Sequence, residues 1–212
     1  MTDAGPAPVI VFDLGGVLID WNPRHLYRKL FDDEAAMERF LSEVCNSEWN
    51  LCQDAGRPFE QAVAELAVVH PEQRELIEAY WHRWPEMVAG PIDDAVEVLA
   101  ELRQAGLELH ALTNWSAETF RLTRGRFEFL TWFRSILVSG EIGLVKPDPR
   151  IFGLLLEGIG RAARDCLYID DSAPNAAAAR ALGFDVVHFR DGRQLRAEMA
   201  ARALVRSAQV DA

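Results

Sequence analysis

Short apolar runs alternate along this chain with longer segments whose apolar residues recur at helical spacing. The first run, residues 9–12, reads Val-Ile-Val-Phe and leads directly into Asp13, with Gly15 and Gly16 close behind. An unbroken run that is rich in β-branched residues is typical of a strand buried on both faces. The two glycines permit a sharp turn and a close approach of the backbone to a ligand.

The same alternation resumes after residue 90. The pattern predicts a helix that ends at Gly106, and then strands at 107–113, 135–139, 166–170 and 186–189 and helices at 117–124, 149–159, 173–182 and 194–204. Strands that alternate with helices form right-handed crossovers in a parallel sheet. We therefore predict an α/β fold with a doubly wound parallel sheet, a Rossmann-like core.

The stretch between residues 22 and 89 has a different character, with little strand-like sequence. Helices are predicted at 23–30, 33–44, 59–69 and 71–87. Pro23 and Pro71 suit the first turn of a helix, where a missing N–H does no harm. We expect an all-helical insertion at 21–89, placed after the first strand within a core domain of residues 1–20 and 90–212.

Polar side chains gather at the carboxyl ends of the predicted strands, and one lysine lies in a proline-stiffened loop between them. The set is Asp13, Thr113, Asn114, Lys146, Asp170 and Asp171. Carboxyl ends of parallel strands meet at one edge of the sheet, which is where such folds bind ligands. Carboxylate oxygens suit Mg²⁺, and a lysine ammonium suits phosphate, so this edge favours a divalent cation with an anionic substrate.

Composition excludes several other classes of function. The formal net charge is −11, which argues against a sequence-independent nucleic-acid surface because such a surface needs a basic excess. No apolar run approaches 18 residues and the N-terminus lacks a signal-peptide pattern, so we expect no membrane association. The three cysteines show no metal-ligand spacing, which favours reduced thiols in the cytoplasm. The oligomeric state is left open.

Four motifs in this order resemble those of the haloacid dehalogenase-like (HAD) hydrolase superfamily. They are Phe12-Asp13-Leu14-Gly15-Gly16-Val17, Leu112-Thr113-Asn114, Lys146-Pro147, and Tyr168-Ile169-Asp170-Asp171 with Asn175. The subgroup pattern is similar to bacterial sugar-phosphate phosphatases and to the N-terminal phosphatase domain of soluble epoxide hydrolases. The helical insertion resembles the family's cap, and residues 53–57 followed by Phe59 resemble its substrate-specificity loop.

The resemblance implies a Mg²⁺-dependent phosphatase that acts on a small phosphate ester, such as a sugar phosphate, through an aspartyl-phosphate on Asp13. The catalytic residues would be Asp13, Thr113 and Lys146; the metal ligands would be Asp13, the Gly15 carbonyl, and one or both of Asp170 and Asp171, supported by Asn175. The phosphoryl group would contact Thr113, Asn114 and Lys146. From their positions, Trp21, Trp115 and Arg57 are further candidates for substrate contact.

One position departs from the pattern of most phosphatases in this superfamily. They carry a second aspartate two residues after the nucleophile as the general acid and base, and here that position is Gly15. General acid–base catalysis typically contributes about 10²–10⁴-fold. Asp20 and His25 are the nearest replacements in the sequence. Two alternatives follow: a 2-haloacid dehalogenase, which also lacks the second aspartate, and a non-catalytic ligand-binding domain.

Overall fold

The computed structural model describes residues 7–205 and contains a five-stranded parallel sheet with the strand order β5-β4-β1-β6-β7. The strands are β1 (Val9–Phe12), β4 (Leu109–Thr113), β5 (Ser135–Val138), β6 (Cys166–Asp170) and β7 (Asp185–His188). Each predicted strand is present, with its ends shifted by no more than two residues. The predicted doubly wound α/β fold is confirmed.

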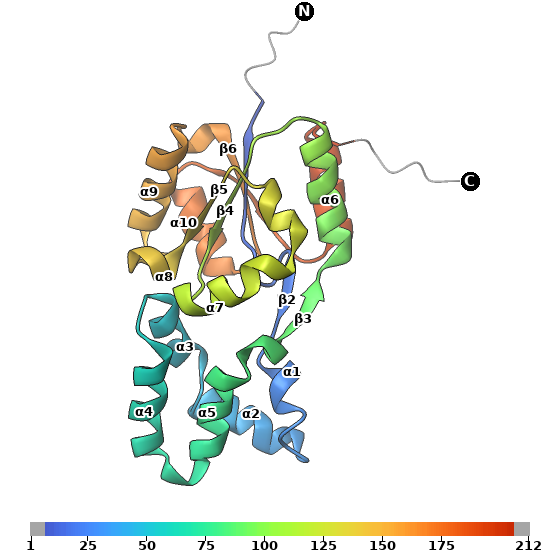
Figure 1. Ribbon diagram of the computed structural model, residues 1–212. Coiled ribbons are helices and arrows are strands. Elements are labelled where there is room, and N and C mark those ends of the chain that lie inside the picture. The colour runs from blue at the N-terminus through green and yellow to red at the C-terminus, as the bar shows by residue number, and fades with distance from the viewer. Residues whose placement is uncertain (1–6, 206–212) are drawn as a thin grey trace, which may run out of the picture.

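Helices cover both faces of this sheet (Figure 1). α6 (Asp93–Gln104) and α11 (Gly192–Ala201) pack together on one face, and α9 (Pro149–Ile159) and α10 (Ala173–Ala181) lie on the other. The alternation in β1 matches this arrangement, because Ile10 and Phe12 join the hydrophobic cluster of the first face whereas Val9 and Val11 join that of the second. The apolar run before Asp13 is therefore buried on both sides.

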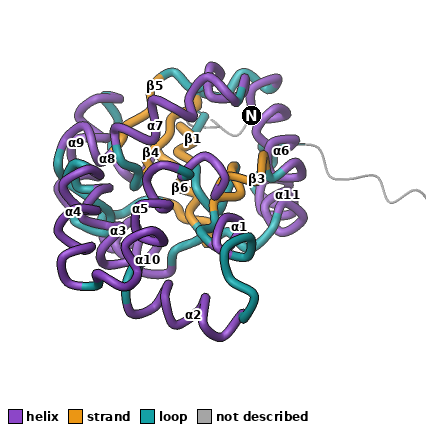
Figure 2. Tube along the Cα trace, turned by 60° about the horizontal axis from the view of Figure 1, so that its bottom comes forward, coloured by secondary structure: helices purple, strands orange, loops and turns teal. Residues whose placement is uncertain are grey.

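The chain leaves the core through β2 (Ile19–Trp21) and returns through β3 (Val88–Pro91), and between them lies the helical insertion, residues 22–87, which we call the cap segment. It contains α1 (Arg24–Tyr27), α2 (Glu34–Glu43), α3 (Ser47–Asp54), α4 (Phe59–Val69) and α5 (Arg74–His82), with 3₁₀ turns at Pro71–Gln73 and Trp84–Met87. The cap segment lies beyond the edge at which β1 ends (Figures 1 and 2). The exact division into core and cap domains stays a prediction.

The cap segment and the two strands that flank it differ from the sequence prediction in several places. The expected helix at 71–87 is broken into three pieces, and Pro85, which has no N–H to donate, lies in the last of them. The pairing of β2 with β3 was not predicted, because it joins two short stretches that are distant in the chain. α3 was also missed, although Asn46 caps its first turn by accepting a hydrogen bond from the Trp49 N–H at 2.8 Å.

The remaining helical elements lie in the connections between the strands of the sheet. They are α7 (Ala117–Thr123), α8 (Ser139–Ile142) and 3₁₀ turns at Arg124–Arg126, Glu128–Trp132 and Ala163–Asp165. α7 follows the end of β4, and α8 follows β5 directly. None of the helices within residues 7–205 combines the length and the apolar character that a bilayer crossing requires.

Candidate active site

Lys146 lies at the centre of the polar cluster and is fully buried. Its Nζ lies 2.9 Å from Asp13 Oδ1 and 2.8 Å from Asp170 Oδ2, and it donates a hydrogen bond to the Leu112 carbonyl at 3.0 Å. Burial by itself lowers the pKa of this ammonium, but the two carboxylates outweigh it and hold the pKa above its usual value. One cation thus joins the ends of β1, β4 and β6.

Asp170 is held by donors on both of its oxygens. Besides Lys146, the Tyr168 hydroxyl donates to Oδ2, the Ser172 N–H donates to Oδ1 at 2.8 Å, and the Asn175 amide lies 3.2 Å from each oxygen. Asn175, predicted to support the metal site, therefore contacts one of its carboxylates. Because its lone pairs are shared among these donors, Asp170 is suited to fixing the position of Lys146.

Asp13, Asp170 and Asp171 each place one carboxylate oxygen within 4.8 Å of the others. Burial raises the pKa of Asp13 to about 7, Lys146 opposes this, and the charges of Asp170 and Asp171 add to it. Within residues 7–205, no side chain donates a hydrogen bond to the Asp171 carboxylate, which is exposed. A crowded set of oxygen donors with one free carboxylate fits Mg²⁺.

Gly16 allows Asp171 to approach the turn after β1. Its φ is +75°, and a Cβ added there would lie 2.4 Å from Asp171 Oδ2. Both the backbone conformation and the close approach therefore require glycine at this position. This turn brings Asp171, which follows β6, against the segment that carries Asp13.

The Thr113 side chain gives a second indication that the site fits a ligand. Its hydroxyl is buried at the end of β4 and has no hydrogen-bond partner among the described residues. Leaving a buried hydroxyl unpaired typically costs about 1–3 kcal/mol. An oxygen of a bound ligand would remove this penalty, so the residues present fit a phosphoryl group as well as a cation.

Asn114 contacts the loop that carries Lys146. Its amide nitrogen donates to the Lys146 carbonyl at 3.0 Å, and the Lys146 N–H donates to Asn114 Oδ1 at 2.8 Å. This pair of hydrogen bonds orients the lysine loop, a role that the sequence did not reveal. The predicted contact of Asn114 with phosphoryl oxygens stays a prediction.

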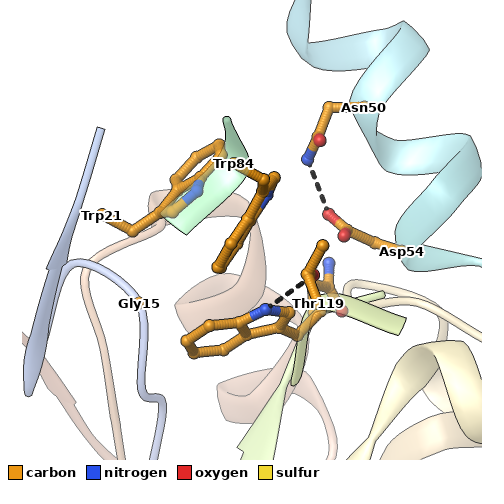
Figure 3. A pocket seen from close by; sticks show the side chains of 8 residues that line it. Gly15, Trp21, Asn50, Asp54, Trp84 and Thr119 are labelled. Atoms are coloured by element: carbon orange, nitrogen blue, oxygen red, sulfur yellow. Dashed lines mark hydrogen bonds between the residues drawn. The ribbon is translucent and has the colours of Figure 1, made fainter. Parts of the chain in front are cut away.

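A pocket lies between the core and the cap segment beside this cluster, and Figure 3 shows its walls. It is lined by Gly15, Trp21, Asn50, Asp54, Trp84, Asn114, Trp115 and Thr119. The predicted substrate contacts Trp21 and Trp115 therefore both face it. Sequence reasoning did not assign Asn50, Asp54, Trp84 or Thr119 to the site. Only Asp54 had a signal, since it lies in the stretch that resembles the specificity loop.

Other candidates are not brought to the pocket. The Arg57 side chain donates to Gln53 Oε1 at 2.7 Å and lies 3.5 Å from a Glu65 oxygen, and it does not line the pocket. Asp20 and His25 form a pair with each other at 2.9 Å and do not line it either. These contacts engage all three side chains away from the pocket. The predicted contact of Arg57 with the substrate is therefore supported by the sequence alone.

The family model of the haloacid dehalogenase-like hydrolases matches residues 7–183. The chain belongs to this family and is a hydrolase. A sesquiterpene phosphatase of Aspergillus oryzae is 26% identical over 186 residues, covering 85% of this chain and 89% of that protein. A phosphoserine phosphatase of Thermus thermophilus is 33% identical over 116 residues, covering 55% of this chain but only 46% of that protein.

Solved structures show the same fold. A HAD family enzyme of Bacteroides thetaiotaomicron, in complex with magnesium and inorganic phosphate, superposes with a TM-score of 0.67 at 22% sequence identity. The match covers 88% of this chain and 96% of that one. The overall fold of this chain is thus one that is known from solved structures.

Proposed function

We propose that the protein is a Mg²⁺-dependent phosphatase that hydrolyses a small phosphorylated metabolite through an aspartyl-phosphate on Asp13. The observation that carries this proposal is the convergence of the Asp13, Asp170 and Asp171 carboxylates within 4.8 Å, with Lys146 paired to two of them. Such a cluster repels a carboxylate substrate unless cations balance it, and it suits a phosphate held by a metal and a lysine.

Asp13 would attack phosphorus with one carboxylate oxygen. The N–H of Leu14 donates to its Oδ1 at 2.7 Å, and Lys146 pairs with the same atom, so the side chain is oriented before substrate binds. A carboxylate is a weak nucleophile, so this orientation and the neutralisation of charge must supply most of the rate enhancement. The Thr113 hydroxyl, which has no protein partner among the described residues, would donate to a phosphoryl oxygen.

Asp13, Asp171 and the backbone carbonyl of Gly15 would hold the metal. Asp171 suits direct coordination better than Asp170, whose oxygens already accept several hydrogen bonds. When bound, Mg²⁺ supplies positive charge to the phosphoryl oxygens and reduces their repulsion of the nucleophile.

The organic part of the substrate would occupy the pocket beside the cluster. Three tryptophans, Trp21, Trp84 and Trp115, form much of its wall, and the Trp21 indole N–H is buried without a partner among the described residues. Flat apolar faces with a few polar groups are suited to a small ring or chain that carries hydroxyls. Sugar phosphates and other phosphorylated metabolites are therefore the first class to screen. The similarity of the chain to phosphatases also supports a phosphate ester as the substrate.

The test measures hydrolysis of p-nitrophenyl phosphate and a panel of phosphorylated metabolites by the purified protein, with Mg²⁺ and with excess EDTA. We expect activity that requires Mg²⁺ and that falls at least 10³-fold in Asp13→Asn. Fluoroberyllate should bind at Asp13 in the wild-type protein and not in that variant. Equal rates with EDTA, or unchanged activity in Asp13→Asn, would contradict the proposal.

A 2-haloacid dehalogenase is the second candidate, and the glycine at position 15 favours it. The dehalogenase reaction needs no metal. Without a bound cation, however, the three carboxylates of this site would repel a carboxylate substrate, which argues against the dehalogenase. Release of chloride from 2-chloropropionate without added metal would support the dehalogenase, and its absence under conditions where phosphate esters are cleaved would exclude it.

A further inference from the structure

Gly15 leaves open space where a catalytic side chain could stand. A Cβ added at this glycine would meet no atom within 4 Å, and its backbone does not have a left-handed φ. The residue lines the pocket beside the nucleophile. An acid at position 15 would therefore be tolerated sterically, and the chain has none there.

Asp54 lines the same pocket from the cap segment, across from Gly15 (Figure 3). It is the last residue of α3, and its Oδ2 accepts a hydrogen bond from the Asn50 amide at 3.0 Å. The Tyr80 hydroxyl in turn donates to Asn50 Oδ1 at 3.0 Å. This chain of contacts fixes the carboxyl group on the pocket wall. No lysine or arginine within residues 7–205 forms a salt bridge with it.

The end of α3 is also tied to the core. The buried Ser139 hydroxyl donates to the Asp54 backbone carbonyl at 2.6 Å and accepts from the Trp115 N–H at 2.9 Å. A Cβ at the neighbouring Gly140 would lie 2.5 Å from the Ala117 nitrogen, so the backbones here are in close contact. The position of Asp54 relative to the core is therefore set by a direct contact between α3 of the cap segment and α8, which follows β5.

We propose that Asp54 is the general acid and base of this enzyme and replaces the aspartate that position 15 lacks. The inference rests on the proposed function. As Asp13 forms its bond to phosphorus, the bond to the leaving oxygen breaks, and that oxygen keeps the electron pair and takes the proton of Asp54. In the second step the Asp54 carboxylate takes a proton from water as the water oxygen attacks phosphorus, which releases Asp13 and inorganic phosphate.

The electrostatic setting of Asp54 supports this role. Burial raises its pKa to about 7, while hydrogen bonding to the Ser116 backbone and the charge of Lys146 act in the opposite direction. A group that titrates near neutral pH is available in both protonation states, which an acid and base in successive steps requires. By contrast, Asp20 and His25 are paired with each other outside the pocket.

The first experiment compares the wild-type protein with Asp54→Asn on phenyl phosphate, p-nitrophenyl phosphate and 2,4-dinitrophenyl phosphate under saturating Mg²⁺. A less basic leaving group needs less help from an acid. We expect kcat/KM of the variant to fall about 10²–10⁴-fold on phenyl phosphate and less than about 5-fold on the dinitrophenyl ester. Glu48→Gln, which changes an exposed carboxylate on the same helix, is the matched control and should retain full activity.

The second experiment places aspartate at position 15 in the Asp54→Asn variant. Because that position is open, adding Gly15→Asp should raise kcat/KM on phenyl phosphate at least about 10-fold above that of the Asp54→Asn variant. An equal loss on all three esters in Asp54→Asn, no loss at all, or a double variant no faster than the single one would overturn the role of Asp54. If the wild-type protein cleaves none of the esters, the phosphatase proposal fails, and the proposal for Asp54 fails with it.

Discussion

The ammonium of Lys146 lies 2.9 Å from Asp13 Oδ1, and it is completely shielded from solvent. A buried ion pair gives little net stabilisation over apolar residues, but removing one partner leaves an uncompensated charge. Lys146→Met leaves two carboxylates, Asp13 and Asp170, without their cation. We expect it to lower the free energy of unfolding by about 3–5 kcal/mol and to abolish activity. Urea denaturation followed by circular dichroism measures the first effect.

A double variant separates the charge from the packing of the lysine stem. Asp13→Asn combined with Lys146→Met removes one of the two stranded carboxylates, so part of the lost stability should return. The coupling energy between positions 13 and 146 is then positive and of the order of 1–3 kcal/mol. Additive effects of the two substitutions would show that the ion pair does not stabilise the fold.

Gly16→Ala should weaken the activation of the enzyme by Mg²⁺, because it displaces Asp171. The substitution strains a backbone at φ +75° and places a Cβ 2.4 Å from the Asp171 carboxylate, which must move from its position. We expect a loss of stability of about 1–3 kcal/mol and at least 10-fold weaker Mg²⁺ activation. Gly158→Ala is the matched control, because this glycine lies in α9 with open space around its Cβ; its stability should stay the same or rise. Unchanged Mg²⁺ activation in Gly16→Ala would contradict the assignment of Asp171 as a ligand.

The sequence was sufficient for the features that local patterns determine. The apolar run before Asp13 predicts a strand buried on both faces, and strand ends predict that Thr113 and Asp170 share an edge, as they do. The position of the cap segment depends instead on contacts between distant residues. Arg57 is the right type for an anion, yet its guanidinium turns to Gln53 and Glu65, and no local pattern reports this.

The sequence places Asp54 in a stretch that resembles the specificity loop, but it does not predict the role of this residue, for a similar reason. It ends a short helix whose apolar residues show weak periodicity, and its approach to the pocket depends on the hydrogen bond from Ser139. The role of Asn114 in orienting the lysine loop likewise requires two segments to meet. The functional side chains at strand ends can thus be predicted from the sequence. The hydrogen-bond partners of each of these side chains depend on tertiary packing and cannot.

Mg²⁺ binding should strengthen as the pH rises through 7. The pKa of Asp13 is raised to about 7, so below that pH the carboxyl carries a proton that must leave before the oxygen can coordinate a cation. We expect the dissociation constant for Mg²⁺ to fall by up to about 10-fold per pH unit between pH 5.5 and 7 and to level off above pH 8. Isothermal titration calorimetry in buffers of different ionisation enthalpy should detect release of up to one proton per metal at pH 6. In Asp13→Asn, proton release should disappear; its persistence would assign the proton to another group.

The three cysteines should differ sharply in their reactivity toward thiol reagents. Cys52 is exposed on α3, whereas Cys45 and Cys166 are buried, and burial raises the pKa of their thiols to about 12 and about 11. Since the thiolate is the reactive form, one thiol should react with Ellman's reagent at pH 8 in the native protein and three in guanidinium chloride. Cys52→Ser should remove the native reaction entirely and leave two thiols in denaturant. Rapid labelling of a second thiol in the native protein would show that the packing around Cys45 in the cap segment, or around Cys166 at the start of β6, is looser than described, because a buried thiol becomes reactive only when its surroundings open.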